Sequence, residues 1–189
     1  MRIGSACTGY GGLDQAVQAV LGGTLAWVAD PDPGAAALLA HHYPDVPNLG
    51  DITIADWGQA EAVDIITAGY PCQPFSVAGN REGASDERHI WPYVAEAVRA
   101  VRPRYVYLEN VPGHLSLGFG RVVADLAALG YVGSWRCVRA SDVGAAHRRE
   151  RVFILAHLAD AQGDRYRNAW ALQVTHRTPR VLPLHRPRS

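Results

Sequence analysis

The sequence predicts an α/β fold in which a mostly parallel sheet carries helices on both faces. Strand-like and helix-like segments alternate along most of the chain, and this order builds parallel sheets joined by crossover helices. A glycine-rich turn separates the first strand from the first helix, and polar or reactive residues follow several strands. With 189 residues, the chain is long enough for one ordinary domain with a core of its own.

Each element has its own signal. Runs of aliphatic and β-branched residues predict strands at 2–6, 25–29, 64–68 and 105–108. Two further strands, at 131–139 and 151–156, could pair with each other antiparallel. Apolar residues at helical spacing predict helices at 13–21, 35–42, 90–101 and 120–129. Pro33 suits the first turn of the second helix, and Gly130 ends the last. Residues 73–88 are predicted to form a polar loop.

The charge is balanced overall but unevenly distributed. Formal net charge is zero, so bulk charge does not indicate a nucleic-acid partner. All 18 basic residues are arginine, which we attribute to a compositional bias. Residues 161–189 carry six arginines against Asp164, and this segment contains three prolines without clear periodicity. We therefore expect a domain over 1–160 and a basic, poorly ordered tail or the truncated start of another domain over 161–189.

Cysteine usage bears on the compartment. Cys7, Cys72 and Cys137 are odd in number and far apart, without a zinc-binding spacing. This pattern argues against a disulfide framework or a metal site and favours the reducing cytoplasm. Neither a signal peptide nor a membrane span is visible in the sequence.

The glycine-rich turn reads Cys7-Thr8-Gly9-Tyr10-Gly11-Gly12. Its glycines let the backbone turn sharply and approach a ligand closely. Asp30 ends the next strand, where nucleotide-binding sheets place the carboxylate that accepts hydrogen bonds from ribose hydroxyls. Asp51 follows a third segment and could meet an adenine. Taken alone, the turn could equally be structural, or part of a nicotinamide dinucleotide site. Its Gly-x-Gly-Gly spacing favours an adenosine with an amino-acid group over a dinucleotide.

The most informative stretch is Gly69-Tyr70-Pro71-Cys72-Gln73-Pro74-Phe75-Ser76. It places a thiol just beyond a strand, where open α/β sheets carry their chemistry. Glu109 ends a strand expected to lie beside it, and Arg149 and Arg151 follow later in the chain. Singly, a cysteine is more often a buried hydrophobe, a strand-end glutamate a helix cap and an arginine run a solvated face. Their joint order on one sheet favours a catalytic reading.

These motifs resemble those of the DNA (cytosine-5) methyltransferases of bacteria and phages. The resemblance covers about residues 2–157 and rests on four elements in order. They are the glycine turn, Pro71-Cys72-Gln73, Glu109-Asn110-Val111 and a form of a Gln-x-Arg-x-Arg motif at 147–151. The resemblance implies a Rossmann-like fold that binds S-adenosylmethionine, and transfer of its methyl group to a cytosine flipped out of double-stranded DNA.

The resemblance also implies a role for each residue. Cys72 is the nucleophile that adds to C6 of the ring, Glu109 meets N3, and Arg149 and Arg151 lie near O2. We expect Glu109 to be a buried carboxyl that can carry a proton, and the arginines to favour the thiolate. The cofactor-binding residues are the turn 7–12, Asp30 on the ribose, Asp51 and Ile52 near adenine, and Pro71. Gln73, Ser76 and Arg88 belong to a loop that closes over the base and contacts DNA.

The chain departs from the family pattern at three positions and at its end. Cys7 stands where many relatives have Phe, Ser5 where many have Asp, and His147 where the arginine motif has Gln. A target-recognition domain and a closing segment with an Asn-Ser-Val-type sequence are not visible. We therefore expect half of a split enzyme with a separate recognition polypeptide, a truncated chain, or a degenerate remnant. Each predicts an uncovered apolar patch on the sheet near the cofactor.

Two other classes of protein remain as alternatives. The first is a non-catalytic DNA-binding or partner subunit that retains the fold and contacts phosphates through the basic tail. The second is a nicotinamide-dependent enzyme, which the glycine spacing and the pairing of Cys72 with Glu109 argue against.

Overall fold

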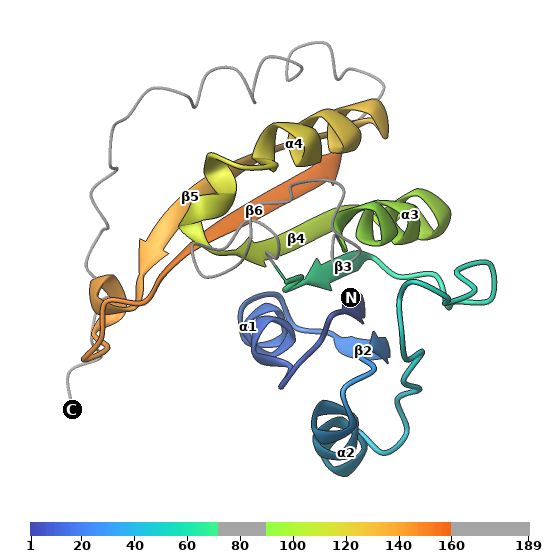
Figure 1. Cartoon of the computed structure of the whole chain (residues 1–189). Coiled ribbons are helices and arrows are strands. Elements are labelled where there is room, and N and C mark those ends of the chain that lie inside the picture. Colours follow the sequence, from blue (N-terminus) through green and yellow to red (C-terminus); the bar gives the residue numbers. More distant parts are fainter. Residues whose placement is uncertain (72–89, 160–189) are drawn as a thin grey trace.

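The computed structural model describes residues 1–71 and 90–159. Its centre is a six-stranded sheet with the order β2-β1-β3-β4-β6-β5 (Figure 1). The strands are β1 (Arg2–Ala6), β2 (Thr24–Ala29), β3 (Ile65–Ala68), β4 (Tyr105–Asn110), β5 (Tyr131–Arg139) and β6 (Glu150–Leu158). The helices are α1 (Gly12–Leu21), α2 (Pro33–His42), α3 (Trp91–Val101) and α4 (Phe119–Ala128), with short 3₁₀ turns η2 (Pro112–Leu115) and η3 (Ala140–Val143).

The sheet is parallel over four strands and antiparallel at one edge. β2, β1, β3 and β4 pair parallel, whereas β6 pairs antiparallel with both β4 and β5. The predicted α/β class, the order of elements and the antiparallel pairing of the last two strands are therefore confirmed. Because the four parallel strands all end at the same edge of the sheet, the loops that follow them gather there. The predicted loop at 73–88 lies outside the described residues.

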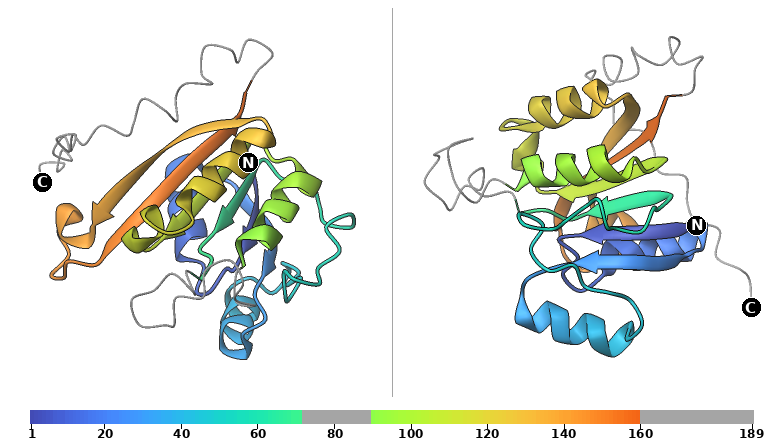
Figure 2. Two further views of the ribbon diagram at one scale, coloured as in Figure 1. Left: turned by 45° about the horizontal axis from the view of Figure 1, so that its top comes forward. Right: turned by 90° about the vertical axis from the view of Figure 1, so that its right-hand side faces the viewer.

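Helices cover both faces, as predicted (Figure 2). The buried side chains of α3 and α4 belong to the larger core cluster, including Val94, Val98 and Leu126. Val17 of α1 and Leu39 of α2 belong to the second cluster, on the other face. Apolar burial on two sides of one sheet is the main stabilising contribution in this architecture.

The second helix begins as the sequence predicts. Pro33 occupies its first turn, and the side chain of Asp32 accepts a hydrogen bond of 2.8 Å from the Ala35 N–H. A capping carboxylate satisfies a backbone donor that would otherwise have no partner in the helix. This cap fixes the chain directly after Asp30, one of the predicted site residues.

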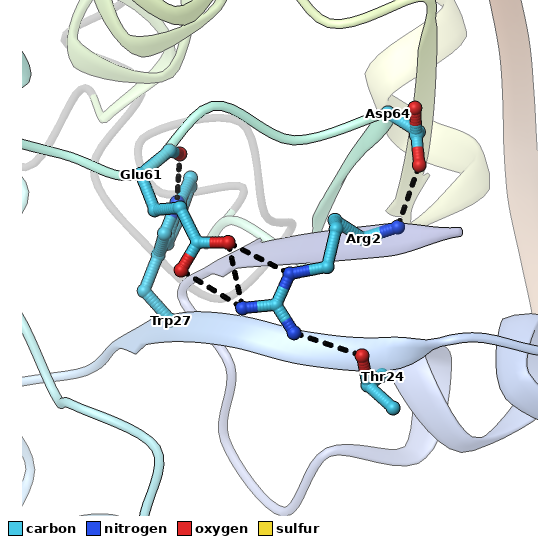
Figure 3. Close-up of polar contacts among 5 residues, drawn as sticks. All are labelled: Arg2, Thr24, Trp27, Glu61 and Asp64. Atoms are coloured by element: carbon cyan, nitrogen blue, oxygen red, sulfur yellow. Dashed lines mark hydrogen bonds and ion pairs between the residues drawn. The ribbon is translucent and has the colours of Figure 1, made fainter.

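A polar cluster ties the long segment before β3 to the sheet edge away from the site (Figure 3). The Arg2 guanidinium donates to both carboxylate oxygens of Glu61, at 2.7 and 2.8 Å, and to the Thr24 hydroxyl. The Arg2 backbone N–H donates to Asp64, and the Trp27 indole N–H donates to the Glu61 carbonyl. Since the ion pair is half exposed, it contributes only about 0–1 kcal/mol, and its main role is to fix geometry.

One half of the sheet is covered on a single face. On the face opposite α3 and α4, Tyr107 stacks on Phe153 with ring centroids 6.0 Å apart. Leu155, on the same face, is 47% exposed. Within residues 1–71 and 90–159, no helix packs over this part of β6 and β5 (Figure 1). We call Tyr107, Phe153 and Leu155 the open sheet face; Tyr107 and Phe153 also line the larger of the two clefts described below. The uncovered apolar patch near the cofactor stays a prediction from the sequence.

Gly4 provides a test of the packing between β1 and β2. A Cβ at this position would lie 2.1 Å from a ring carbon of the Trp27 indole, which has no room to move within the core. We expect Gly4→Ala to lower the free energy of unfolding by about 1–3 kcal/mol, as overpacked cores do. Urea denaturation followed by tryptophan fluorescence measures the change. Gly120→Ala is the matched control, because no atom lies within 4 Å of its added methyl and alanine favours a helix by up to ~1 kcal/mol. An unchanged midpoint for Gly4→Ala would contradict the packing described here.

Candidate active site

Two clefts meet at the carboxyl edge of the parallel strands. The larger has a volume of about 680 Å³ and the smaller about 360 Å³. Three residues line both of them: Cys7 and Gly9 of the glycine turn, and Gly69 after β3. The two clefts are therefore neighbours that share one wall, which suits two ligands that must react with each other.

The glycine turn is held by short-range hydrogen bonds. Gly9 and Gly11 have φ values of 54° and 73°, in the left-handed region that glycine tolerates. The Thr8 hydroxyl donates to the Ser5 carbonyl at 3.1 Å, and the Gly11 N–H donates to the Thr8 carbonyl at 2.9 Å. Cys7 also has a positive φ, of 51°, which is uncommon for a residue with a side chain. The turn is thus a defined shape and a strained one.

Asp30 lies beside this turn, as predicted from its place after β2. The Gly9 N–H donates to one of its carboxylate oxygens at 2.8 Å, and the Asp32 N–H donates to the other at 3.0 Å. The Asn48 side chain holds the Asp30 backbone through two hydrogen bonds, of 3.0 and 3.1 Å. Asn48 was not anticipated, because a lone asparagine in an irregular segment gives no sequence signal.

The residues predicted to bind a cofactor come together. The smaller cleft is lined by Cys7, Gly9, Asp30, Asp51, Ile52 and Pro71, and the larger by Thr8, Tyr10 and Gly12 among others. Gly11 lies within the same turn and N-caps α1. A carboxylate, an apolar side chain and a glycine-lined backbone in one cleft are groups that can hold a ribose, an adenine and an amino-acid moiety.

The Cys7 thiol is poorly suited to be a nucleophile. Burial raises its pKa to about 12, and the negative charges of Asp30 and Asp51 act in the same direction. The pKa of Cys137, on β5, is also raised, first by burial and then by Glu150, although Arg139 opposes this. Since the thiolate is the reactive form, both thiols remain protonated near neutral pH.

A buried carboxyl lies where the first turn of α1 meets the sheet. Asp14 is 1% exposed and accepts hydrogen bonds from the hydroxyls of Ser5, at 2.8 Å, and Thr67. Burial raises the pKa of Asp14, while the two hydroxyl donors lower it. All three residues line the larger cleft. Asp14 was not among the predicted site residues; its signal in the sequence is an acid two positions after the glycine motif.

Glu109 and Arg151, both predicted site residues, line the larger cleft. Glu109, near the end of β4, forms an ion pair of 2.7 Å with the guanidinium of Arg151 on β6. Their side chains are 26% and 22% exposed. Glu109 is thus half-buried and paired with a cation, which differs from the expectation of a buried carboxyl. Antiparallel pairing of β4 with β6 produces this contact, because it brings the start of β6 to the end of β4.

Arg149 lies on the connection between η3 and β6. Its side chain is exposed and lines the larger cleft together with Glu109 and Arg151. Its carbonyl accepts a hydrogen bond of 2.8 Å from the Ala140 N–H, which fixes the backbone at the tip of the β5–β6 hairpin. The cleft therefore gathers Glu109, Arg149 and Arg151 as the resemblance implied.

The end of β4 is joined to the segment that leaves β3. The Asn110 side-chain amide donates to the Tyr70 carbonyl at 3.1 Å, and its oxygen accepts the Val111 N–H at 2.8 Å. The Tyr70 hydroxyl is hydrogen-bonded to Nε2 of His114 at 2.9 Å. Neither Tyr70 nor His114 was a predicted site residue, because residues 44 positions apart reveal their contact only in the fold.

Four predicted residues lie outside the described part of the chain: Cys72, Gln73, Ser76 and Arg88. Pro71 is the last described residue before them and lines the smaller cleft. Over residues 1–71 and 90–159, no group of three or more His, Cys, Asp or Glu side chains could hold a metal ion. In the same described ranges, no helix is long and apolar enough to cross a membrane.

Comparison with known proteins agrees with this arrangement. The model of the family described as C-5 cytosine-specific DNA methylase matches residues 1–180. The type II methyltransferase M.NlaIV of Neisseria lactamica is 36% identical over 138 residues, which cover 67% of this chain and 33% of that protein. M2.BsuMI, a type II methyltransferase of Bacillus subtilis, is 31% identical over 173 residues, covering 87% and 44%.

A solved structure shows the same fold. A putative DNA modification methyltransferase encoded within an Escherichia coli prophage superposes with a TM-score of 0.69 at 23% identity, over 84% of this chain and 47% of that one. This chain thus spans between a third and a half of the length of these relatives. The family model covers nearly all of its residues, and the chain belongs to the C-5 cytosine-specific DNA methylases.

Proposed function

We propose that this chain carries the catalytic part of a DNA (cytosine-5) methyltransferase that uses S-adenosylmethionine. The observation that carries the proposal is the pair of adjoining clefts, one with Asp30 and the other with Glu109 and Arg151, which share Cys7, Gly9 and Gly69. One cleft suits a nucleoside cofactor and the other a flat base with hydrogen-bonding edges. Residues 1–160 form the catalytic domain in this proposal, and the basic segment 161–189 adds contacts to phosphates.

The smaller cleft has groups that fit the cofactor. The Asp30 carboxylate still has acceptor capacity for ribose hydroxyls beside its two backbone donors. Asp51 and Ile52 meet the adenine, and the glycine turn lets the backbone approach the methionine group. The bound cofactor supplies an electrophilic methyl on a sulfonium. The two carboxylates that line this cleft, Asp30 and Asp51, suit a cationic ligand.

In the larger cleft, the chain acts on the base. The Cys72 thiolate adds to C6 of cytosine, which makes C5 nucleophilic enough to take the methyl group. Glu109 holds N3, and Arg151 with Arg149 stabilises the charge that develops at O2. A water molecule then takes the proton from C5, the electrons of that C–H bond re-form the C5–C6 double bond, and the C6–S bond breaks to release the Cys72 thiolate. The ion pair keeps the Glu109 and Arg151 side chains oriented before the base enters.

The properties of the other two cysteines support Cys72 as the nucleophile. Burial raises the pKa values of both Cys7 and Cys137, so neither ionises readily. Cys72 follows Pro71 directly, and Pro71 lines the cleft that holds the cofactor in this proposal. Gln73, Ser76 and Arg88, in the segment beyond, contact the DNA backbone and the space left by the flipped base.

We further propose that recognition of the DNA sequence comes from a region that corresponds to the part of the relatives to which this chain does not align. The relatives are two to three times longer than the segment they share with it. The open sheet face offers apolar side chains against which such a region can pack. A separate recognition polypeptide is the form we test below. The sparse, unpaired cysteines agree with action on DNA in the cytoplasm.

The nucleophile is tested by methyl transfer and covalent capture. With labelled S-adenosylmethionine and mixed-sequence duplex DNA, we expect label in 5-methylcytosine after digestion to nucleosides. Cys72→Ser should reduce transfer by at least ~1,000-fold, because no thiolate adds to C6. It should also abolish the covalent adduct with a 5-fluorocytosine duplex. Cys137→Ser is the matched control, since that cysteine of β5 lines neither cleft, and it should retain full activity.

Each outcome of this experiment separates the candidates. If the chain acts only after addition of a polypeptide that carries the recognition region, the site is catalytic and recognition is separate. If DNA binds with or without that polypeptide and neither transfer nor adduct appears, the chain is a non-catalytic subunit. Equal activity of wild type and Cys72→Ser would disprove the role of Cys72.

Cofactor binding is tested at Asp30. Asp30→Ala removes a charged acceptor that also orders the Gly9 N–H. Because a hydrogen bond to a charged group contributes roughly 1.5–3 kcal/mol, we expect the Kd for S-adenosylmethionine to rise about 10- to 100-fold. Isothermal titration calorimetry measures it. Asp45→Ala, an exposed carboxylate outside both clefts, is the control and should leave Kd unchanged. An Asp30→Ala chain that binds like wild type would place the cofactor elsewhere.

A further inference from the structure

We propose that the hydrogen bond between Tyr70 and His114 positions the nucleophilic segment Pro71-Cys72 against Glu109. Tyr70 and His114 are then positioning residues for the reaction, acting through the main chain rather than touching the base. This inference rests on the proposed function, and it concerns two residues that the motif pattern leaves without a role. It starts from the geometry of the chain where it leaves β3.

Tyr70 is held at its backbone by β4, which carries Glu109, and at its hydroxyl by η2, which follows β4. The Asn110 amide, one residue after Glu109, donates to the Tyr70 carbonyl at 3.1 Å. The Tyr70 hydroxyl meets His114 Nε2 at 2.9 Å, and His114 lies in η2, which directly follows β4. One bond fixes the backbone of Tyr70, and the other fixes its ring. Together they lock the exit from β3 to the end of β4.

Aromatic packing makes this connection rigid. The Tyr70 ring lies 5.5 Å from that of Trp91, the first residue of α3, and 5.7 Å edge-on from His114. His114 in turn meets Phe119, the first residue of α4, edge-on at 6.3 Å. Tyr70 and His114 are 4% and 2% exposed. Residues of α3 and α4 thus pack against the pair, and side chains packed this tightly occupy single rotamers.

The Tyr70 hydroxyl is the group that can distinguish a positioning role from packing alone. A phenylalanine at position 70 would fill the same space, whereas a buried tyrosine must find a partner for its O–H. Here that partner lies on the segment that follows Glu109. A bond that only stabilised the core would change stability when removed. A bond that positions the next residues would also change the rate of the chemical step.

Only Pro71 stands between Tyr70 and Cys72, and its ring fixes one of the backbone torsions that join them. Consecutive Cα atoms are about 3.8 Å apart, so two residues span at most ~7.5 Å. A shift of the Tyr70 backbone therefore moves the point from which the Cys72 segment starts. Misplacement of a reacting group by ~1 Å can cost about 100-fold in rate. The Tyr70–His114 bond limits such shifts relative to Glu109, which meets the opposite edge of the ring.

The experiment compares Tyr70→Phe, His114→Phe and the double variant in the form of the protein that shows transfer. The measured quantities are the single-turnover rate of methyl transfer, the rate of adduct formation with 5-fluorocytosine DNA, and the Kd for S-adenosylmethionine. The matched control is Tyr131→Phe, which removes a buried hydroxyl that donates to the Pro103 carbonyl at 2.6 Å, away from both clefts.

We expect Tyr70→Phe to slow adduct formation and transfer about 10-fold, with Kd within twofold of wild type. Its melting temperature should fall no further than that of Tyr131→Phe. The double variant should be no slower than the slower of the two single variants, because each change already removes the bond that Tyr70 shares with His114. His114→Phe keeps an aromatic ring against Phe119, so the packing persists while the bond is lost.

Three results would overturn the inference. Rates for Tyr70→Phe equal to those of Tyr131→Phe would make the bond structural only. Multiplicative losses in the double variant would show that the two residues act independently. A wild-type chain that forms no adduct in any form would overturn the proposed function and this inference with it, which distinguishes that failure from the first two.

Discussion

The site depends on the parallel register of three strands. Ala6 of β1 pairs with Ala68 of β3, and Ala68 pairs with Leu108 of β4. The next residue of each strand, Cys7, Gly69 and Glu109, therefore emerges at the same level of the sheet edge. Backbone hydrogen bonds between strands thus set the positions of groups separated by a hundred residues in sequence. The wall shared by the two clefts and the position of the Glu109 carboxylate in the larger cleft both follow from this alignment.

The positions of the strands and of the residues at their ends could be predicted from the sequence, because a short run of residues is enough to identify each strand. Apolar runs identify β1, β3 and β4, and the site candidates at the ends of these strands follow from their place in the sequence. The contact of Glu109 with Arg151 was harder, since it needs the antiparallel register in which Glu109 faces Phe153. Arg151 lies two residues before Phe153 and contacts Glu109 diagonally across the two strands. The alternation of apolar and polar residues does not fix the register that allows this contact.

Two hydrogen bonds between distant residues could not be predicted from the sequence, because they too depend on how the elements pack. The Tyr70–His114 and Asp14–Thr67 bonds join residues 44 and 53 positions apart. No motif spacing marks them, because each depends on how a helix or 3₁₀ turn packs on the sheet. The half-buried state of Glu109 also follows from packing, because its carboxylate pairs with Arg151 of β6 at the wall of the larger cleft. Strand ends are therefore predictable, whereas the side chains that fix them in space are not.

In the proposed function, the open sheet face makes activity depend on the concentration of the region that binds to it. Tyr107, Phe153 and Leu155 offer apolar surface whose burial favours association with whatever region completes the sheet. If that region is on another polypeptide, the amount of complete enzyme follows the product of two concentrations, and dilution switches methylation off. If it is tethered to this chain, its effective concentration is fixed and the enzyme is independent of abundance. In the proposed function, whether a cell tunes methylation through expression of one gene or of two therefore depends on whether that region is tethered to this chain.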